Sequence, residues 1–133
     1  MKIYTSYFGN IKRLKEAGVM PVCISKLKPK FYQGAAMSSV APTRYMLSDE
    51  CSTEEYIKLY EGILTRLGAN IIYNEIKSIS KGNDVALICY EKPGDFCHRH
   101  LLSDFLNRNL GLDISEFVSA EPKKQIIQTS LFD

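Results

Sequence analysis

The clearest strand signal in the sequence is the stretch Val85-Ala86-Leu87-Ile88-Cys89-Tyr90. Its apolar residues are consecutive rather than alternating, which is typical of a central parallel strand that is covered on both faces. The run is far shorter than the roughly 20 apolar residues that a membrane-spanning helix needs. It therefore predicts the centre of an α/β fold and no membrane span.

Strand and helix patterns alternate along the rest of the chain. The other predicted strands are residues 2–8, Val19–Ser25 and the short edge strand Ile114–Val118. The predicted helices are Ile11–Ala17, with Asn10 as its cap, an amphipathic helix that begins at Ser52 and ends at Gly68, residues 70–80, and Cys97–Leu110. This order predicts a small three-layer α/β sandwich with a mostly parallel central sheet of Rossmann or flavodoxin-like topology.

Length and composition indicate an ordinary globular protein. The chain has 133 residues, of which 45% are hydrophobic, and we expect one α/β domain over residues 1–120 and a flexible tail over 121–133. Residues 26–49 mix proline, glycine and polar side chains and predict a long irregular segment. The amino terminus lacks a continuous apolar region, so we expect no secretory signal and a cytoplasmic protein, in which the four cysteines are thiols.

The net charge of +2 conceals an asymmetry. Up to Arg44 the chain holds eight basic residues and one acidic residue, whereas the remainder holds nine basic and fourteen acidic residues. We expect the basic half to attract anionic partners such as phosphates or nucleic acid, near the rim of a pocket. The residues concerned are Lys12, Arg13, Lys15, Lys26, Lys28 and Lys30.

Residues 89–100 include the end of the predicted central strand and the start of the next helix, at the edge of the sheet where α/β proteins hold their sites. A thiol at Cys97, in the first turn of a helix and beside Arg99 and a protonated His98, is expected to have a lowered pKa, which makes Cys97 a candidate nucleophile. The backbone N–H groups of that turn and Arg99 are equally suited to bind an oxyanion. Glu91 is a candidate proton acceptor.

Structural roles for the same residues stay open at this point. Cysteine is among the most buried residue types, so Cys89 and Cys97 also fit a packing role. His98 and His100 lie two residues apart on a helix, so at most one of them is expected to reach the site. Redox chemistry between the two cysteines would require Cα atoms within about 7 Å of each other.

Three other kinds of site do not match the spacing. A cysteine-dependent phosphatase loop places five residues between its cysteine and its arginine, but at that distance Asp95 follows Cys89 and Ser103 follows Cys97. The paired spacings of structural zinc sites do not occur, nor do the glycine fingerprints of nicotinamide enzymes and P-loop ATPases. We therefore expect no metal and no cofactor.

The stretch from Val85 to Leu101 closely resembles the signature of the domain of unknown function (DUF) family 488, in its short bacterial-type members with a Cys-His-Arg motif. Other pieces similar to that family are Tyr4–Phe8, Ile24-Ser25-Lys26, Ala41-Pro42 and Glu54-Glu55-Tyr56. The resemblance covers most of residues 2–118 and implies a compact α/β fold. Lys26 stands where the family pattern leads us to expect arginine, which argues against a bidentate grip on an anion there.

This resemblance implies a pocket but carries no assigned activity. The Cys-His-Arg cluster is expected to meet strand-end residues from the amino-terminal half. The catalytic candidates are Cys97, Glu91, His98 and Arg99, and the substrate-binding candidates are Ser6, Lys26 and Cys89. Such a set suits nucleophilic or acid–base work on an anionic substrate, for example a nucleotide or nucleic acid.

The carboxyl terminus carries a separate motif. Residues Gln128-Thr129-Ser130-Leu131-Phe132 resemble the Gln-Leu-Ser-Leu-Phe peptide with which bacterial replication and repair proteins dock on the DNA sliding clamp. Gln128, Leu131 and Phe132 are the expected contacts, with the two apolar side chains as anchors. The alternative is that these side chains pack on the domain or fray.

Two function classes follow from these patterns. One is a small cysteine-dependent enzyme, such as a transferase, a hydrolase or a nucleic-acid-processing enzyme, with Cys97, Glu91 and Arg99 at its centre. The other is a non-catalytic module that binds an anion or nucleic acid at the same helix terminus and docks on the clamp through its tail. A thiol-directed probe near neutral pH distinguishes them, because a buried structural thiol does not react.

Overall fold

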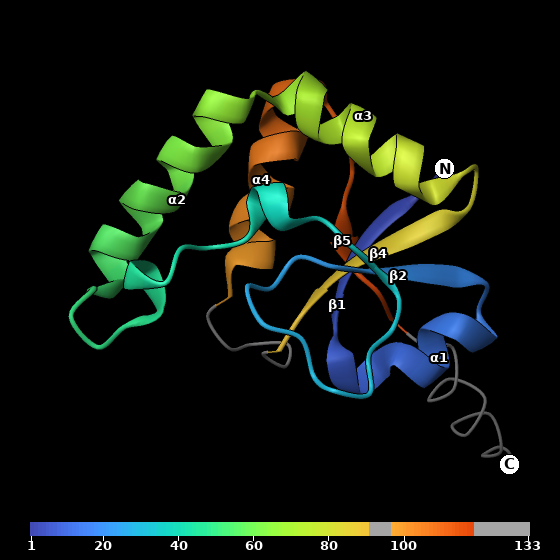
Figure 1. Cartoon of the computed structure of the whole chain (residues 1–133). Helices are drawn as coiled ribbons and strands as arrows, with labels where there is room; N and C mark the ends of the chain where they lie inside the picture. Colours follow the sequence, from blue (N-terminus) through green and yellow to red (C-terminus); the bar gives the residue numbers. More distant parts are fainter. Residues whose placement is uncertain (91–96, 119–133) are drawn as a thin grey trace, which may run out of the picture.

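The computed structural model describes residues 1–90 and 97–118, and its centre is a five-stranded sheet (Figure 1). The strands pair in parallel in the order β3-β2-β4-β1-β5. Their bounds are β1 Ile3–Tyr7, β2 Val19–Cys23, β3 Ala35–Ala36, β4 Asp84–Cys89 and β5 Ser115–Glu116. The predicted α/β fold with a parallel central sheet is confirmed.

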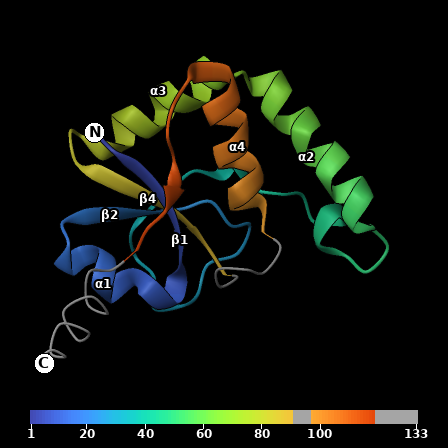
Figure 2. The same ribbon diagram turned by 180° about the vertical axis from the view of Figure 1, so that it is seen from behind.

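Helices cover both faces of this sheet. The helix α1 (Ile11–Glu16) packs on one face, whereas α2 (Thr53–Leu67), α3 (Ala69–Ser80) and α4 (His98–Leu110) pack on the other (Figure 2). Short 3-10 turns lie in the connections: η1 (Phe8–Asn10), η2 (Ser38–Val40) and η3 (Tyr45–Leu47). Within the described part of the chain, no helix has the length and apolar character that crossing a membrane requires.

The central strand β4 explains why its sequence is continuously apolar. Val85, Leu87 and Cys89 belong to the core under α2, α3 and α4, whereas Ala86 and Ile88 belong to the core under α1. All five side chains are buried, because successive residues of a strand point to opposite faces and both faces carry helices.

The strand order positions the edge where the site lies. Because β4 is inserted between β2 and β1, the first two strands of the chain are not neighbours, unlike those in the Rossmann and flavodoxin orders. The carboxyl ends of β2 and β4 instead lie side by side, with Cys23 opposite Ile88. The residues that follow these two strands therefore meet at one edge of the sheet.

Three local predictions need correction. Asn10 precedes α1 but makes no capping hydrogen bond, and its Nδ2 donates to Ser6 Oγ at 3.1 Å. Residues 26–49 are not wholly irregular, because they contain β3, a strand too short to leave an alternating pattern. Cys97 is the N-cap residue of α4 and lies just outside its first turn. The predicted turn at residues 91–96 and the tail at 121–133 lie outside the described residues.

The start of α2 agrees with its sequence signal. Ser52 is the N-cap, and its hydroxyl accepts a hydrogen bond from the backbone N–H of Glu55 at 3.0 Å. The acidic side chains of Glu54 and Glu55 lie in the first turn, where the helix dipole favours negative charge. Gly68 ends the helix with a φ of 88°, a conformation that suits glycine.

Replacement of Ser52 by alanine removes the capping acceptor. We expect Ser52→Ala to lower the free energy of unfolding by about 1 kcal/mol in a urea titration. Ser78→Ala is the matched control, because Ser78 is exposed within α3, where alanine favours the helix slightly. Equal unfolding free energies for Ser52→Ala and the unmodified protein would contradict the capping role.

Candidate functional site

A pocket of about 190 Å³ opens where β2 and β4 end. The residues after β2, the segment between β3 and α2, the helix α2, the residue after β4 and the start of α4 all contribute to its wall. The carboxyl edge of a parallel sheet is the usual ligand position in α/β proteins. The lining residues are Ser25, Lys26, Leu27, Pro42, Leu47, Tyr56, Tyr90, Cys97 and His98.

The mouth of this pocket combines apolar side chains with one cation. Leu27, Leu47 and Tyr90 line it although they are 68%, 53% and 50% exposed. Lys26 is exposed on the same rim. Because the pocket volume is below the roughly 300 Å³ at which small-molecule sites begin, it suits a small group or the end of a longer molecule.

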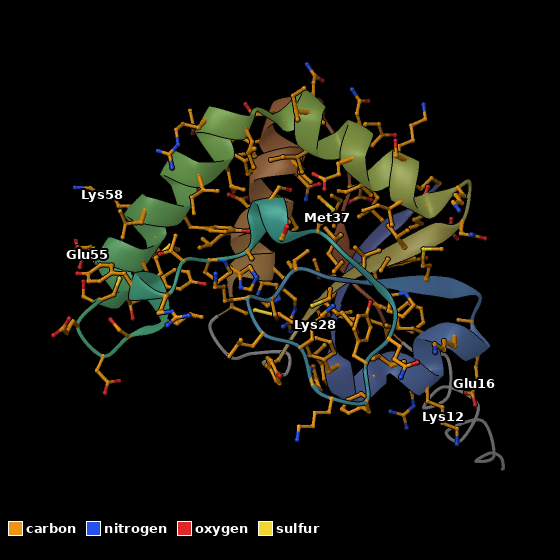
Figure 3. The ribbon with its side chains drawn as sticks, in the orientation of Figure 1. Lys12, Glu16, Lys28, Met37, Glu55 and Lys58 are labelled. Carbon is orange, nitrogen blue, oxygen red and sulfur yellow. A yellow bond between two sulfur atoms is a disulfide. The ribbon has the colours of Figure 1, made fainter. Side chains whose placement is uncertain are left out.

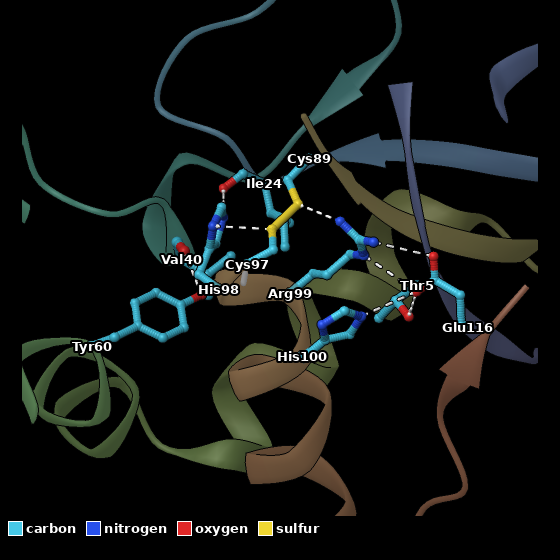
Figure 4. Close-up of a disulfide and its surroundings, with 10 residues drawn as sticks. All are labelled: Thr5, Ile24, Val40, Tyr60, Cys89, Cys97, His98, Arg99, His100 and Glu116. Carbon is cyan, nitrogen blue, oxygen red and sulfur yellow. Dashed lines mark hydrogen bonds and ion pairs between the residues drawn. A yellow bond between two sulfur atoms is a disulfide. The ribbon is translucent and has the colours of Figure 1, made fainter. Parts of the chain in front are cut away.

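Two of the predicted cysteines are bonded to each other. Cys89 ends β4, Cys97 precedes α4, and their sulfur atoms form a disulfide (Figure 4). Their Cα atoms lie 7.4 Å apart, slightly beyond the limit of about 7 Å that disulfides usually observe. Cys97 faces the pocket, whereas Cys89 is completely buried behind it. The expectation of four thiols is therefore wrong for this pair, while Cys23 and Cys51 are free.

His98 is a neutral imidazole beside the disulfide. Its Nε2 lies 2.7 Å from the carbonyl oxygen of Ile24, so Nε2 carries the proton and Nδ1 is an acceptor. Nδ1 lies 3.8 Å from Cys97 Sγ. Burial is the main cause that lowers the pKa of His98 to about 4; the hydrogen bond to the Ile24 carbonyl opposes this effect, and the charge of Arg99 adds to it. His98 is therefore neutral at pH 7, and the protonated form expected from the sequence is wrong.

Tyr60 of α2 holds the imidazole from the side. The two rings meet edge to face with centroids 5.4 Å apart, and the Tyr60 hydroxyl donates to the Val40 carbonyl at 2.7 Å (Figure 4). Burial raises the pKa of Tyr60 well above its ordinary value, so the hydroxyl stays a neutral donor. The orientation of His98 is thus determined by Tyr60 of α2, which is itself held by Val40 of η2, and by Ile24, the residue after β2.

Arg99 points away from the pocket into the sheet. Its side chain is fully buried, and its Nε and Nη2 each donate to a different carboxylate oxygen of Glu116 at 3.2 Å. Its Nη1 donates to Cys89 Sγ at 2.9 Å. Thr5 also donates to Glu116, at 2.6 Å. Arg99 does not line the pocket, so the structure does not support the predicted grip of its guanidinium on an oxyanion there.

The remaining predicted site residues are distributed as follows. Ser6 lies on the α1 face of the sheet, because successive residues of β1 point to opposite faces and Thr5 points to the other one. Its hydroxyl accepts a hydrogen bond from Asn10. It is therefore not part of the pocket. Glu91 lies outside the described residues, as do the tail positions Gln128, Leu131 and Phe132.

The structure also shows where the predicted basic residues and the second histidine lie. Of the six basic side chains expected at the rim, Lys26 lines the pocket, whereas Lys12 and Arg13 lie on α1 beside Glu16, over the other face (Figure 3). His100 is 43% exposed and lies 3.3 Å from Glu116. One of the two histidines therefore reaches the site, as predicted.

The sequence reasoning missed Glu116, whose carboxylate pairs with Arg99 inside the protein. The signal available was a lone carboxylate within the short apolar segment predicted as an edge strand. It also missed Tyr56 and Leu47, which reach the pocket from α2 and η3. Their contribution depends on how those segments fold back over the sheet, and local patterns do not carry that information.

The sulfur cluster is also a candidate metal ligand set. The two Sγ atoms of Cys89 and Cys97 and a ring nitrogen of His98 lie within 4.8 Å of one another. Two thiolates and one imidazole are a donor set that suits zinc. The disulfide, however, leaves neither sulfur as a thiolate, and Arg99 already donates to one of them.

The lowered pKa of His98 predicts a pH-dependent stability. In the unfolded chain the imidazole titrates near 6.5 and in the folded chain at about 4, so the unfolded state binds more protons between these values. The contribution of His98 is complete above pH 6.5 and falls by about 3 kcal/mol as the pH drops towards 4. Gln keeps a donor for Ile24 and does not titrate, so His98→Gln removes this part of the slope in urea titrations at several pH values.

The matched control for this measurement is His100→Gln, because the His100 side chain is 43% exposed whereas His98 is buried. It should keep the pH dependence of the unmodified protein. If both variants follow the unmodified protein between pH 4 and 6.5, His98 is not buried in its neutral form.

Comparison with known protein families gives a match over most of the chain. The family DUF488-N3a, described as the active DUF488-N3 subclade, matches residues 18–110, which include β2, β4, both bonded cysteines and the whole of α4. Searches of curated proteins and of solved structures give no match. On the match over well more than half of its length, the chain belongs to the DUF488 family.

Proposed function

We propose that the protein is a thiol-dependent enzyme that acts through Cys97 Sγ on a small anionic substrate. The observation that carries this proposal is the position of Cys97, whose side chain lines the pocket next to His98 while being part of a buried sulfur pair. The description of the matching subclade as active is in line with an enzyme.

Cys97 serves as the nucleophile once the pair is reduced. Nδ1 of His98, 3.8 Å from the sulfur and without a proton, is placed to accept a hydrogen bond from the thiol. This contact directs the sulfur and receives its proton as the bond to the substrate forms. Because the pKa of His98 is only about 4, the imidazole acts in the reaction step and does not hold a permanent ion pair with Cys97.

The pocket indicates the kind of substrate. Lys26 offers one positive charge on the rim, and Ser25 next to it offers a polar group. Tyr56 and Tyr90 provide aromatic surface for an apolar part of the ligand. The volume of about 190 Å³ suits a small acid or the end of a larger anion such as a nucleotide. Lysine attracts such a group as a point charge and does not clamp it in two places.

Selective alkylation tests the role of Cys97. After reduction, iodoacetamide at neutral pH should modify Cys97 at least about tenfold faster than Cys23, measured by peptide mass spectrometry, because Cys97 lines the pocket whereas Cys23 lies in the core under α1. Cys97→Ser should remove the fast phase, and Cys51→Ser, at the other free cysteine, should leave it in place. An unreactive Cys97 would favour the non-catalytic binding module over an enzyme.

The charge of Lys26 can be tested with a pair of matched reagents. Iodoacetate and iodoacetamide differ in charge but react by the same displacement. The rate of iodoacetate divided by the rate of iodoacetamide at Cys97 therefore reports the local electrostatic potential. We expect Lys26→Gln to lower this ratio by about two- to fivefold, an effect that weakens with added salt. Lys58→Gln, on the outer side of α2, is the control and should leave the ratio unchanged (Figure 3). An unchanged ratio in Lys26→Gln would show that the charge of Lys26 does not act on the substrate.

A further inference from the structure

We propose that Cys89 is the resolving cysteine of the site, and that the pair Cys97–Cys89 reduces a small disulfide substrate by forming its own disulfide. This inference rests on the proposed function, in which Cys97 is the group that meets the substrate. It adds a substrate class, a second reacting residue and a role for the buried Arg99.

The geometry separates the two sulfur atoms by task. Cys97 lines the pocket with 3% of its surface exposed, whereas Cys89 is completely buried and is not among the residues that line it. The two sulfur atoms are nevertheless close enough to be bonded. This arrangement, with one accessible and one concealed sulfur, is what an attacking and a resolving cysteine require.

The charge at the buried sulfur points the same way. Nη1 of Arg99 donates to Cys89 Sγ at 2.9 Å, and this guanidinium is held in place by the two bonds to Glu116. A cation that close stabilises negative charge on Cys89 whenever the pair is open. The Cys97 side of the pair has the neutral His98 instead. In the reduced pair, the negative charge is therefore expected on Cys89 Sγ and not on Cys97 Sγ.

The same contact argues against a metal ion as the purpose of the cluster. A divalent cation on Cys89 Sγ would have to share that atom with the guanidinium, and two positive charges would meet there. A thiol–disulfide pair has no such conflict. The bond between the two cysteines in the structure shows that the oxidised form is compatible with the fold.

The reaction balances in two steps. Cys97 attacks one sulfur of the substrate R–S–S–R′, its proton passes by way of His98 Nδ1 to the leaving group, and R′SH departs as the substrate bond breaks. The Cys89 thiolate then attacks Cys97 Sγ, the mixed bond breaks, and RS⁻ leaves with the electron pair and takes a proton from water. The substrate gains two electrons, the cysteine pair loses two, and an external dithiol reductant restores the pair.

The surroundings narrow the substrate class. Disulfides with a negatively charged, apolar-bodied half would meet Lys26 on the rim and the side chains of Leu27, Leu47 and Tyr90 at the mouth. The aromatic disulfide 5,5′-dithiobis(2-nitrobenzoate) has this character, because each half is a benzoate. It also releases a coloured thiolate, which makes it a suitable probe.

The experiment counts the thiolates released by the reduced full-length chain. In a Cys51→Ser background, which removes the half-buried free cysteine, the pair should release two thiolates per chain and retain no label by intact mass. Adding Cys89→Ser should reduce this to one thiolate, with a stable mixed disulfide at Cys97. Adding Cys97→Ser instead should slow release at least about tenfold, because Cys89 is concealed.

Each other outcome has a definite meaning. A stable label on Cys97 in the background protein would show that Cys89 does not resolve it, which overturns this inference and leaves the thiol enzyme intact. Failure of Cys97 to react at all would overturn the proposed function itself. Retention of one equivalent of Zn²⁺ by the reduced chain after gel filtration, with loss of reactivity, would assign the cluster to metal binding instead.

Arg99 is a positioning residue in this scheme, and its variants give a separate readout. In glutathione redox buffers, Arg99→Met should shift the dithiol–disulfide equilibrium towards the disulfide by about tenfold, because the stabilised thiolate is lost. Arg99→Lys should recover part of this shift. Circular dichroism verifies that both variants are folded. Equal equilibrium constants for folded Arg99→Met and the unmodified protein would show that the charge of Arg99 does not stabilise the Cys89 thiolate.

Discussion

The pairing of Arg99 with Glu116 inside the protein is the interaction on which the site depends. The guanidinium is fully buried and meets the carboxylate through two hydrogen bonds, with Thr5 of β1 as a further donor. It therefore joins three elements that are distant in sequence, namely β1, the start of α4 and the edge strand β5. Taking charges out of water is costly, and removal of one partner from a fully buried pair typically costs about 3–5 kcal/mol, which is an upper bound for this pair because the Glu116 side chain is 23% exposed. A pair of this kind is weak evidence for added stability, but it imposes one orientation on the first turn of α4.

That orientation explains how three consecutive residues perform three different tasks. Cys97 is the extended N-cap residue of α4, and His98 and Arg99 are the first two residues of the helix, which turns about 100° per residue, so the three side chains diverge. Cys97 faces the pocket, His98 turns towards the Ile24 carbonyl, and Arg99 turns under the sheet to Cys89 and Glu116. The anion-binding role expected for Arg99 fails because a carboxylate from β5 already occupies it. Its charge acts on a sulfur atom instead.

Much of the fold was predictable because its signals are local. The apolar run of β4, the periodic face of α2 and the cap at Ser52 each follow from neighbouring residues, and the elements they predict are present. The misses share a different property. The strand β3 is two residues long, Asn10 bonds Ser6 instead of capping α1, and the insertion of β4 between β2 and β1 is decided by pairing across the whole chain. Contacts between residues that are distant in the sequence produce no local periodicity from which they could be predicted.

For the site, the order of residues along the chain already implies that a thiol, an imidazole and a guanidinium gather at the end of the central strand, because they lie where β4 ends and α4 begins. What each of these groups does depends on the folded arrangement. It buried His98 and made it neutral, placed Ser6 on the far face, and brought Cys89 to Cys97 and Glu116 to Arg99. The physical reason is that protonation state, charge pairing and accessibility depend on desolvation and on neighbours in space, and both are properties of the folded chain.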